Sequence, residues 1–169
     1  MKIVWITGGS TGIGLATAKK FIKNEWVVII SSRNQDKLET AKEEILKNST
    51  NNRIYTYKCD ISKRNEVETT IKYITEEIGR IDLAILNAAA YSPNKNQVFS
   101  IENYEHLIDV NLKGTLYCID TLFKNMKYSK GHIAIVSSPV GYRGLPTAGA
   151  YGLTKAGLIN LSESLYFDL

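Results

Sequence analysis

The sequence predicts an α/β protein built on a doubly wound parallel sheet of about five strands, flanked by helices. Two observations lead to this prediction. Short runs of β-branched and aliphatic residues alternate with longer stretches in which apolar residues recur every three or four positions. The short runs are apolar at almost every position, which is typical of parallel strands that are buried on both faces.

Each predicted element follows from its local pattern. The apolar runs predict strands at residues 3–6, 26–30, 54–57, 83–86 and 133–136. Ser62 and Ser100 are placed to cap two of the helices, and Gly79 is placed to end one. The helix after Ser100 is expected to contain a break. The apolar stripes of the helices are Leu15, Ala18 and Ile22; Leu38, Ala41 and Ile45; Val67, Ile71, Ile74 and Ile78; and Leu158, Leu161 and Leu165.

Two stretches without regular spacing, 89–97 and 138–150, begin where predicted strands end. Both therefore belong at the carboxyl edge of the sheet, where open α/β sheets bind their ligands.

The composition limits the classes of function. The 169 residues carry a net charge of +4, which is too balanced for a nucleic-acid binder. No apolar run is long enough to span a membrane. Cys59 and Cys118 are too few for a disulfide framework and indicate a reducing, cytoplasmic location. The cysteines and the two histidines lack the spacing of metal ligands, so we expect no metal site.

A glycine-rich loop, Thr7-Gly8-Gly9-Ser10-Thr11-Gly12-Ile13-Gly14, lies between the first strand and the first helix. Its glycines allow a phosphate to approach the backbone, and the helix N-terminus offers free N–H groups. The alternatives are a tight turn without a ligand and a hydrolase nucleophile elbow, because residues 8–12 also match G-x-S-x-G around Ser10. A hydrolase would need a histidine partner, and only His106 and His132 are present.

The second strand ends in Ser31-Ser32-Arg33, where an NAD-binding unit usually has an acidic residue for the ribose diol. An arginine there can instead bind a 2′-phosphate through a charge-assisted contact. Such a contact is worth roughly 1.5–3 kcal/mol, or about a 10- to 100-fold preference for NADP over NAD. The alternative is a solvated Arg33 that only leads into the next helix.

Tyr151 and Lys155 are four positions apart and therefore share one face of the last helix. A phenol is a poor acid–base catalyst at neutral pH, and a nearby ammonium group lowers its pKa. The pair alone is a weak signal, but here it follows a strand, a serine-rich strand end at Ser137 and Ser138, and a loop rich in glycine and proline.

Taken together, these motifs resemble the short-chain dehydrogenase/reductase family, in its compact branch, from residue 3 to 169. The family's glycine motif matches Thr7, Gly8, Gly12 and Gly14, and its active-site serine matches Ser138. Its Tyr and Lys match Tyr151 and Lys155, its active-site Asn matches Asn111, and its adenine-contacting Asp matches Asp60. The resemblance implies a Rossmann-like sheet with strand order 3-2-1-4-5.

The resemblance implies reversible hydride transfer between NADP(H) and a ketone or secondary alcohol, with NAD(H) as the alternative cofactor. Tyr151 would exchange the proton, Ser138 would bind the substrate oxygen, and Lys155 would lower the pKa of Tyr151 and hold the nicotinamide ribose. Asn111 would hold a water for proton relay. The expected cofactor contacts are Thr7, Gly8, Ser10, Thr11, Gly12, Ile13, Gly14, Ser32, Arg33, Asp60, Ile61, Asn87, Ala88, Ala89, Tyr151 and Lys155.

Two departures from the family pattern stand out. The family's Asn-Asn-Ala-Gly reads Leu86-Asn87-Ala88-Ala89, and we expect Ala89 to be tolerated. Family members also continue beyond the last helix. We therefore expect residues 1–169 to be a single dinucleotide-binding domain truncated at its C-terminus, with the fifth strand at an open or partner-covered sheet edge.

Three questions stay open at this stage. A catalytically incomplete dinucleotide-binding module is the main alternative function, and an epimerase or dehydratase of the family's extended branch is a further one. Tyr142 and Leu145 are candidates for substrate contact, with simple loop exposure as the alternative. The resemblance also allows a homo-oligomer formed through the last two helices, and the expected partner is a small carbonyl or alcohol, without nucleic acid or membrane.

Overall fold

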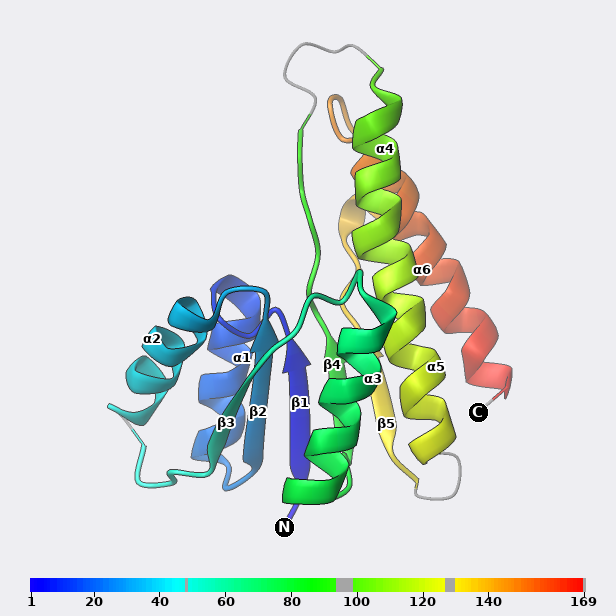
Figure 1. Cartoon of the computed structure of the whole chain (residues 1–169). Coiled ribbons are helices and arrows are strands. Elements are labelled where there is room, and N and C mark those ends of the chain that lie inside the picture. The colour runs from blue at the N-terminus through cyan, green and yellow to red at the C-terminus, as the bar shows by residue number, and fades with distance from the viewer. Residues whose placement is uncertain (48, 94–98, 127–129, 169) are drawn as a thin grey trace.

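Five parallel strands form one sheet in the order β3-β2-β1-β4-β5, which confirms the predicted fold class and strand order (Figure 1). The computed structural model describes residues 1–47, 49–93, 99–126 and 130–168, so part of the predicted irregular stretch 89–97 lies outside the described residues. The strands are β1 (Ile3–Thr7), β2 (Val27–Ser32), β3 (Ile54–Lys58), β4 (Leu83–Leu86) and β5 (His132–Ile135). The helical elements are α1 (Gly12–Lys23), α2 (Gln35–Leu46), α3 (Arg64–Tyr73), η1 (Ile74–Ile78), α4 (Ile101–Leu107), η2 (Ile108–Lys113), α5 (Gly114–Met126), η3 (Pro139–Gly141) and α6 (Gly149–Asp168).

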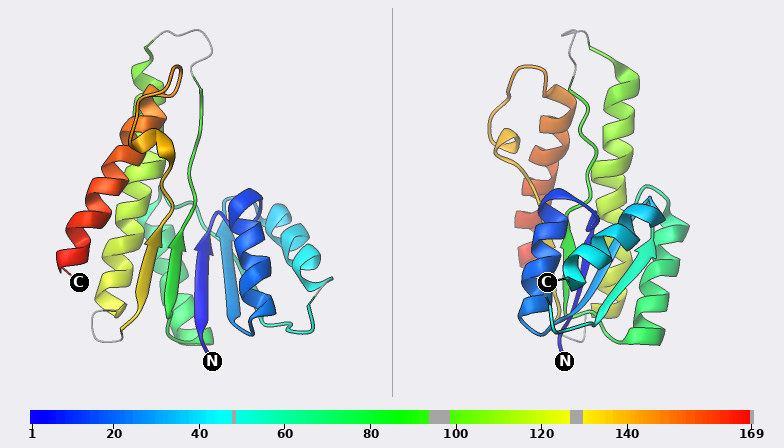
Figure 2. Two further views of the ribbon diagram at one scale, coloured as in Figure 1. Left: turned by 180° about the vertical axis from the view of Figure 1, so that it is seen from behind. Right: turned by 90° about the vertical axis from the view of Figure 1, so that its left-hand side faces the viewer.

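The sheet carries an apolar core on each face. Ala18 and Ile22 of α1 and Leu38 of α2 pack on one face. Val67 of α3 and Leu122 of α5 pack on the other face, where side chains of α6 join them at the margin. Figure 2 shows α1 and α3 on opposite sides of the sheet. Most residues of the predicted helical stripes are buried, and the others, Leu15, Ile78, Leu161 and Leu165, are half-buried, so the apolar spacing located these helices correctly.

Burial decreases from the centre of the sheet to the β5 edge. Every residue of β1 is buried, whereas burial in β4 alternates. In β5, His132 and Ala134 are exposed and Ile133 and Ile135 are half-buried. The expectation of strands buried on both faces thus holds for β1 but not for β5, whose Ile133 and Ile135 pack on the core of one face while His132 and Ala134 are exposed on the other.

The predicted helix boundaries are confirmed in part. Ser100 caps α4 by accepting a hydrogen bond from the amide of Asn103, and Gly79 follows η1 with a φ of 135°. The expected cap at Ser62 is wrong, because α3 begins one residue later, after Lys63. The Ser62 hydroxyl instead donates to Oδ1 of Asp60, at 2.7 Å.

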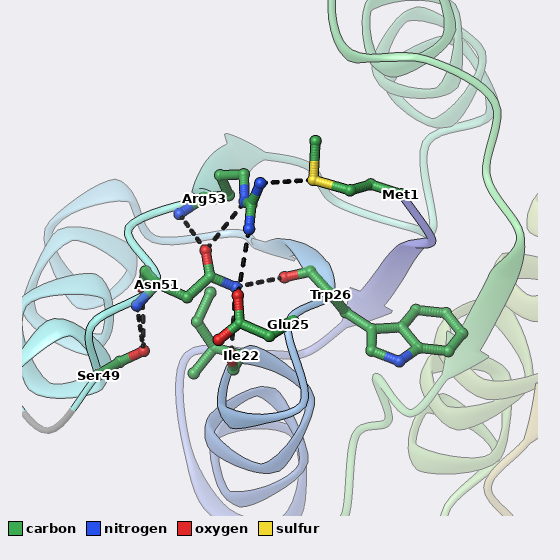
Figure 3. A network of polar contacts seen from close by, with 7 residues as sticks. All are labelled: Met1, Ile22, Glu25, Trp26, Ser49, Asn51 and Arg53. Carbon is green, nitrogen blue, oxygen red and sulfur yellow. Dashed lines mark hydrogen bonds and ion pairs between the residues drawn. The ribbon is translucent and has the colours of Figure 1, made fainter.

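The buried side chain of Asn51 joins three segments of the chain at the end of the sheet opposite the carboxyl edge (Figure 3). The Nδ2 of Asn51 donates to the carbonyls of Ile22 and Trp26, at 3.1 and 3.0 Å. Its Oδ1 accepts from the backbone N–H and the Nε of Arg53, and the guanidinium of Arg53 pairs with Glu25. Asn51 therefore links the end of α1, the start of β2 and the start of β3 through one side chain.

Among the described residues, no helix is both long enough and apolar enough to cross a membrane.

Candidate active site

A pocket of about 330 Å³ opens at the carboxyl edge of the sheet, where β1, β2, β3 and β4 end. It is lined by Gly8, Ser10, Thr11, Gly12, Ile13, Ser32, Arg33, Cys59, Asp60, Ile61, Asn87, Ala88, Ala89 and Val110. Folding thus brings together most of the cofactor contacts expected from the sequence, which come from four separate loops. The Cys59 and Val110 side chains were not among the expected contacts.

The glycine-rich loop leaves hydrogen-bond donors free at the start of α1. Gly8 and Gly12 have φ values of +66° and +55°, a backbone conformation that favours glycine. Thr11 precedes α1 without making a side-chain cap. Within the described part of the chain, the amides of Gly12 and Ile13 have no protein acceptor, since the first helical bond runs from Leu15 to Thr11. Nothing lies within 4 Å of the position of a Cβ on Gly12, so the loop surface there is open.

Two of the expected cofactor residues lie beneath this loop rather than in the pocket. Thr7 is 1% exposed, and its hydroxyl accepts from the amides of Asn87 and Ala88, at 3.0 Å each. Gly14 packs against the loop so closely that an added Cβ would lie 2.3 Å from the carbonyl oxygen of Gly8. Both residues therefore hold the loop in shape without lining the pocket.

Arg33 and Asp60 lie at the end of the pocket formed by β2 and β3. Arg33 is exposed, and no acidic side chain pairs with it among the described residues. One oxygen of Asp60, Oδ1, accepts from the amide and the hydroxyl of Ser62. Burial raises the pKa of the neighbouring Cys59 thiol to about 11, so this side chain stays protonated at neutral pH.

The segment after β4 forms the side of the pocket next to β1. The Nδ2 of Asn87 donates to the carbonyls of Thr7 and Gly8, which joins β4 to the glycine-rich loop. Ala89, which stands where the family motif has glycine, does not have a positive φ. Its Cβ is therefore accommodated without backbone strain, as the sequence analysis expects.

Tyr151 and Lys155 lie on the first turns of α6, beside the strand end of β5. The ammonium of Lys155 is buried and donates to the carbonyl of Val136, at 2.7 Å. Burial lowers the pKa of Lys155 to about 8. Burial raises the pKa of the Tyr151 phenol and Tyr91 raises it further, whereas a hydrogen bond with the Ser138 hydroxyl lowers it.

These contacts differ from the expected relation between the pair. The resemblance implies that the Lys155 ammonium lowers the pKa of Tyr151. In the structure the ammonium lies 5.5 Å from the centroid of the Tyr151 ring and bonds to a main-chain carbonyl instead, and the pKa of the phenol is raised. Ser138 and Tyr151 do lie together, as the resemblance implies.

Asn111 occupies the π-helical segment η2, through which α4 continues into α5, so the predicted helix break is a local widening of the helix and not an interruption. Its side chain is fully buried and makes three hydrogen bonds. Oδ1 accepts from the amide of Ala90 at 2.7 Å, while Nδ2 donates to the carbonyl of Ala90 at 3.0 Å and to the Thr154 hydroxyl at 3.1 Å. Asn111 therefore ties the segment after β4 to the helix that carries Tyr151.

Thr154, Ser137 and Tyr91 support the site, but the sequence alone assigned none of them a role in it. Thr154 accepts from Asn111 and donates to the carbonyl of Tyr151, and Ser137 donates to the carbonyl of Lys155. A partial signal existed for the first two, because each directly precedes a residue of a motif. No local pattern indicated the contact between Tyr91 and Tyr151.

The structure gives the hydrolase alternative no support. Ser10 lines the pocket, but no hydrogen bond among the described residues joins it to His106 or His132. Across the same residues, no group of three or more His, Cys, Asp or Glu side chains could hold a metal ion.

Comparison with known proteins gives a consistent result. The sequence profile of the short chain dehydrogenase family matches residues 2–169. An uncharacterized oxidoreductase from Staphylococcus epidermidis is 29% identical over 169 residues, which are 99% of this chain and 71% of that protein.

Two solved structures share the fold over 99% of this chain. The alcohol dehydrogenase of the archaeon Thermococcus sibiricus, in complex with 5-hydroxy-NADP, superposes with a TM-score of 0.91 at 27% identity, over 71% of its own chain. An NAD⁺-bound xylitol dehydrogenase superposes with a TM-score of 0.89 at 26% identity, over 64% of its own chain. Similar proteins thus bind either form of the dinucleotide.

Proposed function

The chain belongs to the short-chain dehydrogenase/reductase family, and on that premise we propose that it transfers hydride between NADP(H) and a ketone or secondary alcohol. One observation carries the proposal. A pocket with free backbone donors lies at the same sheet edge as a phenol that bonds to a serine hydroxyl and lies next to a buried lysine. This combination suits a reaction that needs a bound anion and an acid–base group.

The residues of the pocket fit a dinucleotide. The free amides at the start of α1 would hold the pyrophosphate, helped by the positive end of the helix dipole. Asp60 and Ile61 would contact the adenine, and the segment from Asn87 to Ala89 would flank the cofactor. When bound, the nicotinamide supplies or accepts the hydride.

The side chains of α6 and β5 would handle the oxygen and its proton. Tyr151 would give a proton to the carbonyl oxygen during reduction and take it back during oxidation. Ser138 would donate a hydrogen bond to the same oxygen and stabilise its developing negative charge. Lys155 would hold the ribose hydroxyls. Asn111 would act mainly as a positioning residue, because its three bonds go to protein groups.

Arg33 supports the preference for NADP. It lines the pocket at the end of β2, and it is exposed and unpaired among the described residues. Because solvent screens an exposed contact between Arg33 and a 2′-phosphate, we expect it to contribute roughly 1.5 kcal/mol, the lower end of the range for such contacts. This corresponds to about tenfold higher affinity for NADP than for NAD.

A binding titration tests the cofactor. NADPH and NADH are titrated into the wild-type chain, the Arg33→Ala variant and a control variant, Arg143→Ala, in which an exposed arginine in the β5–α6 loop is removed. We expect NADPH to bind more tightly than NADH, and Arg33→Ala to weaken NADPH about tenfold while leaving NADH unchanged. Equal affinities in the wild type, or an equal loss for both cofactors in Arg33→Ala, contradict the assignment.

A turnover assay tests the acid–base group. Tyr151→Phe removes only the hydroxyl, and Tyr73→Phe makes the same change on an exposed tyrosine of α3. We expect Tyr151→Phe to lower NADPH-dependent carbonyl reduction at least about 100-fold with unchanged NADPH binding. Full activity in Tyr151→Phe refutes the role. NADPH binding by a wild-type chain without turnover favours the alternative, a dinucleotide-binding module.

Two further points belong to the same proposal. The exposed Leu116 of α5 and Leu153 of α6 are candidates for a contact between two copies through these helices. Both cysteines are free thiols, which supports a reducing location such as the cytoplasm.

A further inference from the structure

The aromatic ring of Tyr91 lies next to Tyr151, the proposed acid–base group. Its ring meets that of Tyr151 edge to face, with the centroids 4.9 Å apart and an angle of 70° between the planes. The contact leaves most of the Tyr91 side chain open, since 60% of the residue is exposed while Tyr151 is half-buried. An exposed ring in fixed contact with a catalytic side chain presents an apolar surface to whatever approaches the phenol.

The backbone on both sides of Tyr91 is anchored. Ala90 makes two hydrogen bonds with the buried side chain of Asn111. On the other side, the carbonyl of Ser92 accepts from Nδ2 of Asn103, at 3.2 Å. Because Asn111 also bonds to Thr154 on α6, the same side chain holds both the segment of Tyr91 and the helix of Tyr151. The placement of the Tyr91 ring is therefore built into the fold.

The two segments that carry Tyr91 and Ser138 hold little charge. Residues 87–93 contain no Asp, Glu, Lys, Arg or His, and the only charged residue among residues 137–150 is Arg143. The second segment also exposes apolar side chains, with Tyr142 76% and Leu145 57% exposed. A polar or anionic substrate would find few partners there beyond the Ser138 and Tyr151 hydroxyls and the exposed Arg143, whereas an apolar group would be shielded from water.

We propose that Tyr91 is a specificity-determining residue and that the site takes uncharged ketones and secondary alcohols whose carbonyl carbon bears an apolar ring or chain. The inference rests on the proposed function, because it assumes that the substrate oxygen binds at Tyr151 and Ser138. With the oxygen there, a substituent on the adjacent carbon reaches the ring that contacts Tyr151. That substituent then packs on the exposed face of Tyr91.

Matched substrates test the class. NADPH-dependent reduction is measured with cyclohexanone, with dihydroxyacetone as a polar uncharged ketone and with acetoacetate as an anionic one. The wild type should favour cyclohexanone in kcat/KM by about tenfold. Tyr91→Ala should lower this preference through KM, Tyr91→Phe should retain it, and Tyr55→Ala on β3, a distant exposed tyrosine, serves as the control. A preference for acetoacetate or dihydroxyacetone, or an equal loss for all three ketones in Tyr91→Ala, overturns the inference.

A binding experiment separates this inference from the proposed function. The chain is labelled with fluorotyrosine, and the fluorine resonances of Tyr91 and Tyr151 are assigned from the Tyr91→Phe and Tyr151→Phe spectra. Cyclohexanol should shift both resonances, and glycerol at the same concentration should not. If cyclohexanol shifts them but no ketone is reduced, the proposed function fails and the apolar subsite stands. If ketones are reduced but cyclohexanol leaves Tyr91 unmoved, the inference fails and the proposed function stands.

Discussion

Replacing Asn111 by alanine should destabilise the fold more than any loss of a single exposed hydrogen bond. The substitution removes three bonds, and two of them satisfy the amide and the carbonyl of one residue, Ala90. The third partner, the Thr154 hydroxyl, keeps its bond to the carbonyl of Tyr151. The main consequence is therefore a pair of backbone groups that lose their partners next to a fully buried position.

The expected magnitude follows from that pair. An unsatisfied buried backbone group costs about 1–3 kcal/mol, so two would cost about 2–6 kcal/mol, and the half-buried Ala90 favours the lower part of that range. The missing amide leaves space into which a water molecule can enter and restore part of the bonding. We therefore expect a loss of about 2–4 kcal/mol in the free energy of unfolding, a large part of the stability of a domain.

Urea unfolding measures this loss through the fluorescence of Trp5, which is fully buried at the centre of the sheet. The midpoint should fall with little change in the m-value. Asn103→Ala is the matched control, since it removes one bond from an asparagine to the same segment at an exposed site, and it should cost less than about 1 kcal/mol. If Asn111→Ala costs no more than Asn103→Ala, the reasoning that Asn111 clamps Ala90 is refuted.

Two further predictions concern stability. Asn51→Ala should lower the free energy of unfolding by about 2–3 kcal/mol, because it leaves the carbonyls of Ile22 and Trp26 without this donor. The control Asn52→Ala, at the neighbouring exposed position, should change the free energy of unfolding by less than about 0.5 kcal/mol. Urea denaturation measures both. Burial lowers the pKa of Lys155 from 10.5 to about 8 in the folded chain. Between these two pH values the unfolded chain therefore binds more protons than the folded chain. The contribution of Lys155 to the free energy of unfolding should rise with pH across this window. A Lys155→Met variant measured in parallel from pH 7 to 10 should lack this rise, and identical pH profiles for the two proteins would contradict it.

The sheet was predictable because its signal is local and repeated. The central strands are short apolar runs, and the helices between them show apolar stripes. The strand order and the handedness of the crossovers then follow from a few general rules of parallel sheets. Ser62 shows where such reasoning stops. A serine before a helical stretch resembles a cap, but Asp60 competes for its hydroxyl and α3 begins after Lys63. Which residue starts the helix depends on the course of the chain in space.

The candidate site was predictable as a set of residues but not as a set of contacts. The loop glycines and Arg33 stand at strand ends, so topology alone gathers them at one edge. The bonds of Asn111 to Ala90 join positions 21 residues apart, and the Tyr91–Tyr151 contact joins positions farther apart still. Neither pairing leaves a periodic trace in the sequence, because each depends on how the segment after β4 lies against η2 and α6.

The opposite pKa shifts of Tyr151 and Lys155 have one cause and one consequence. Burial disfavours the charged form of both groups, so it raises the pKa of the phenol and lowers that of the ammonium. A protonated phenol is the form that donates to a carbonyl oxygen, whereas alcohol oxidation needs the phenolate.

If Tyr151 is the acid–base group, as proposed, its protonated phenol suits ketone reduction at neutral pH. We expect kcat/KM for ketone reduction to stay constant from pH 6 to 8, and kcat/KM for alcohol oxidation to increase with pH over the same range. The measurement compares both directions with saturating cofactor. A reduction rate that falls as the pH rises through 7 would mean that the Tyr151 pKa is lowered rather than raised in the working site, and that Lys155 outweighs burial there.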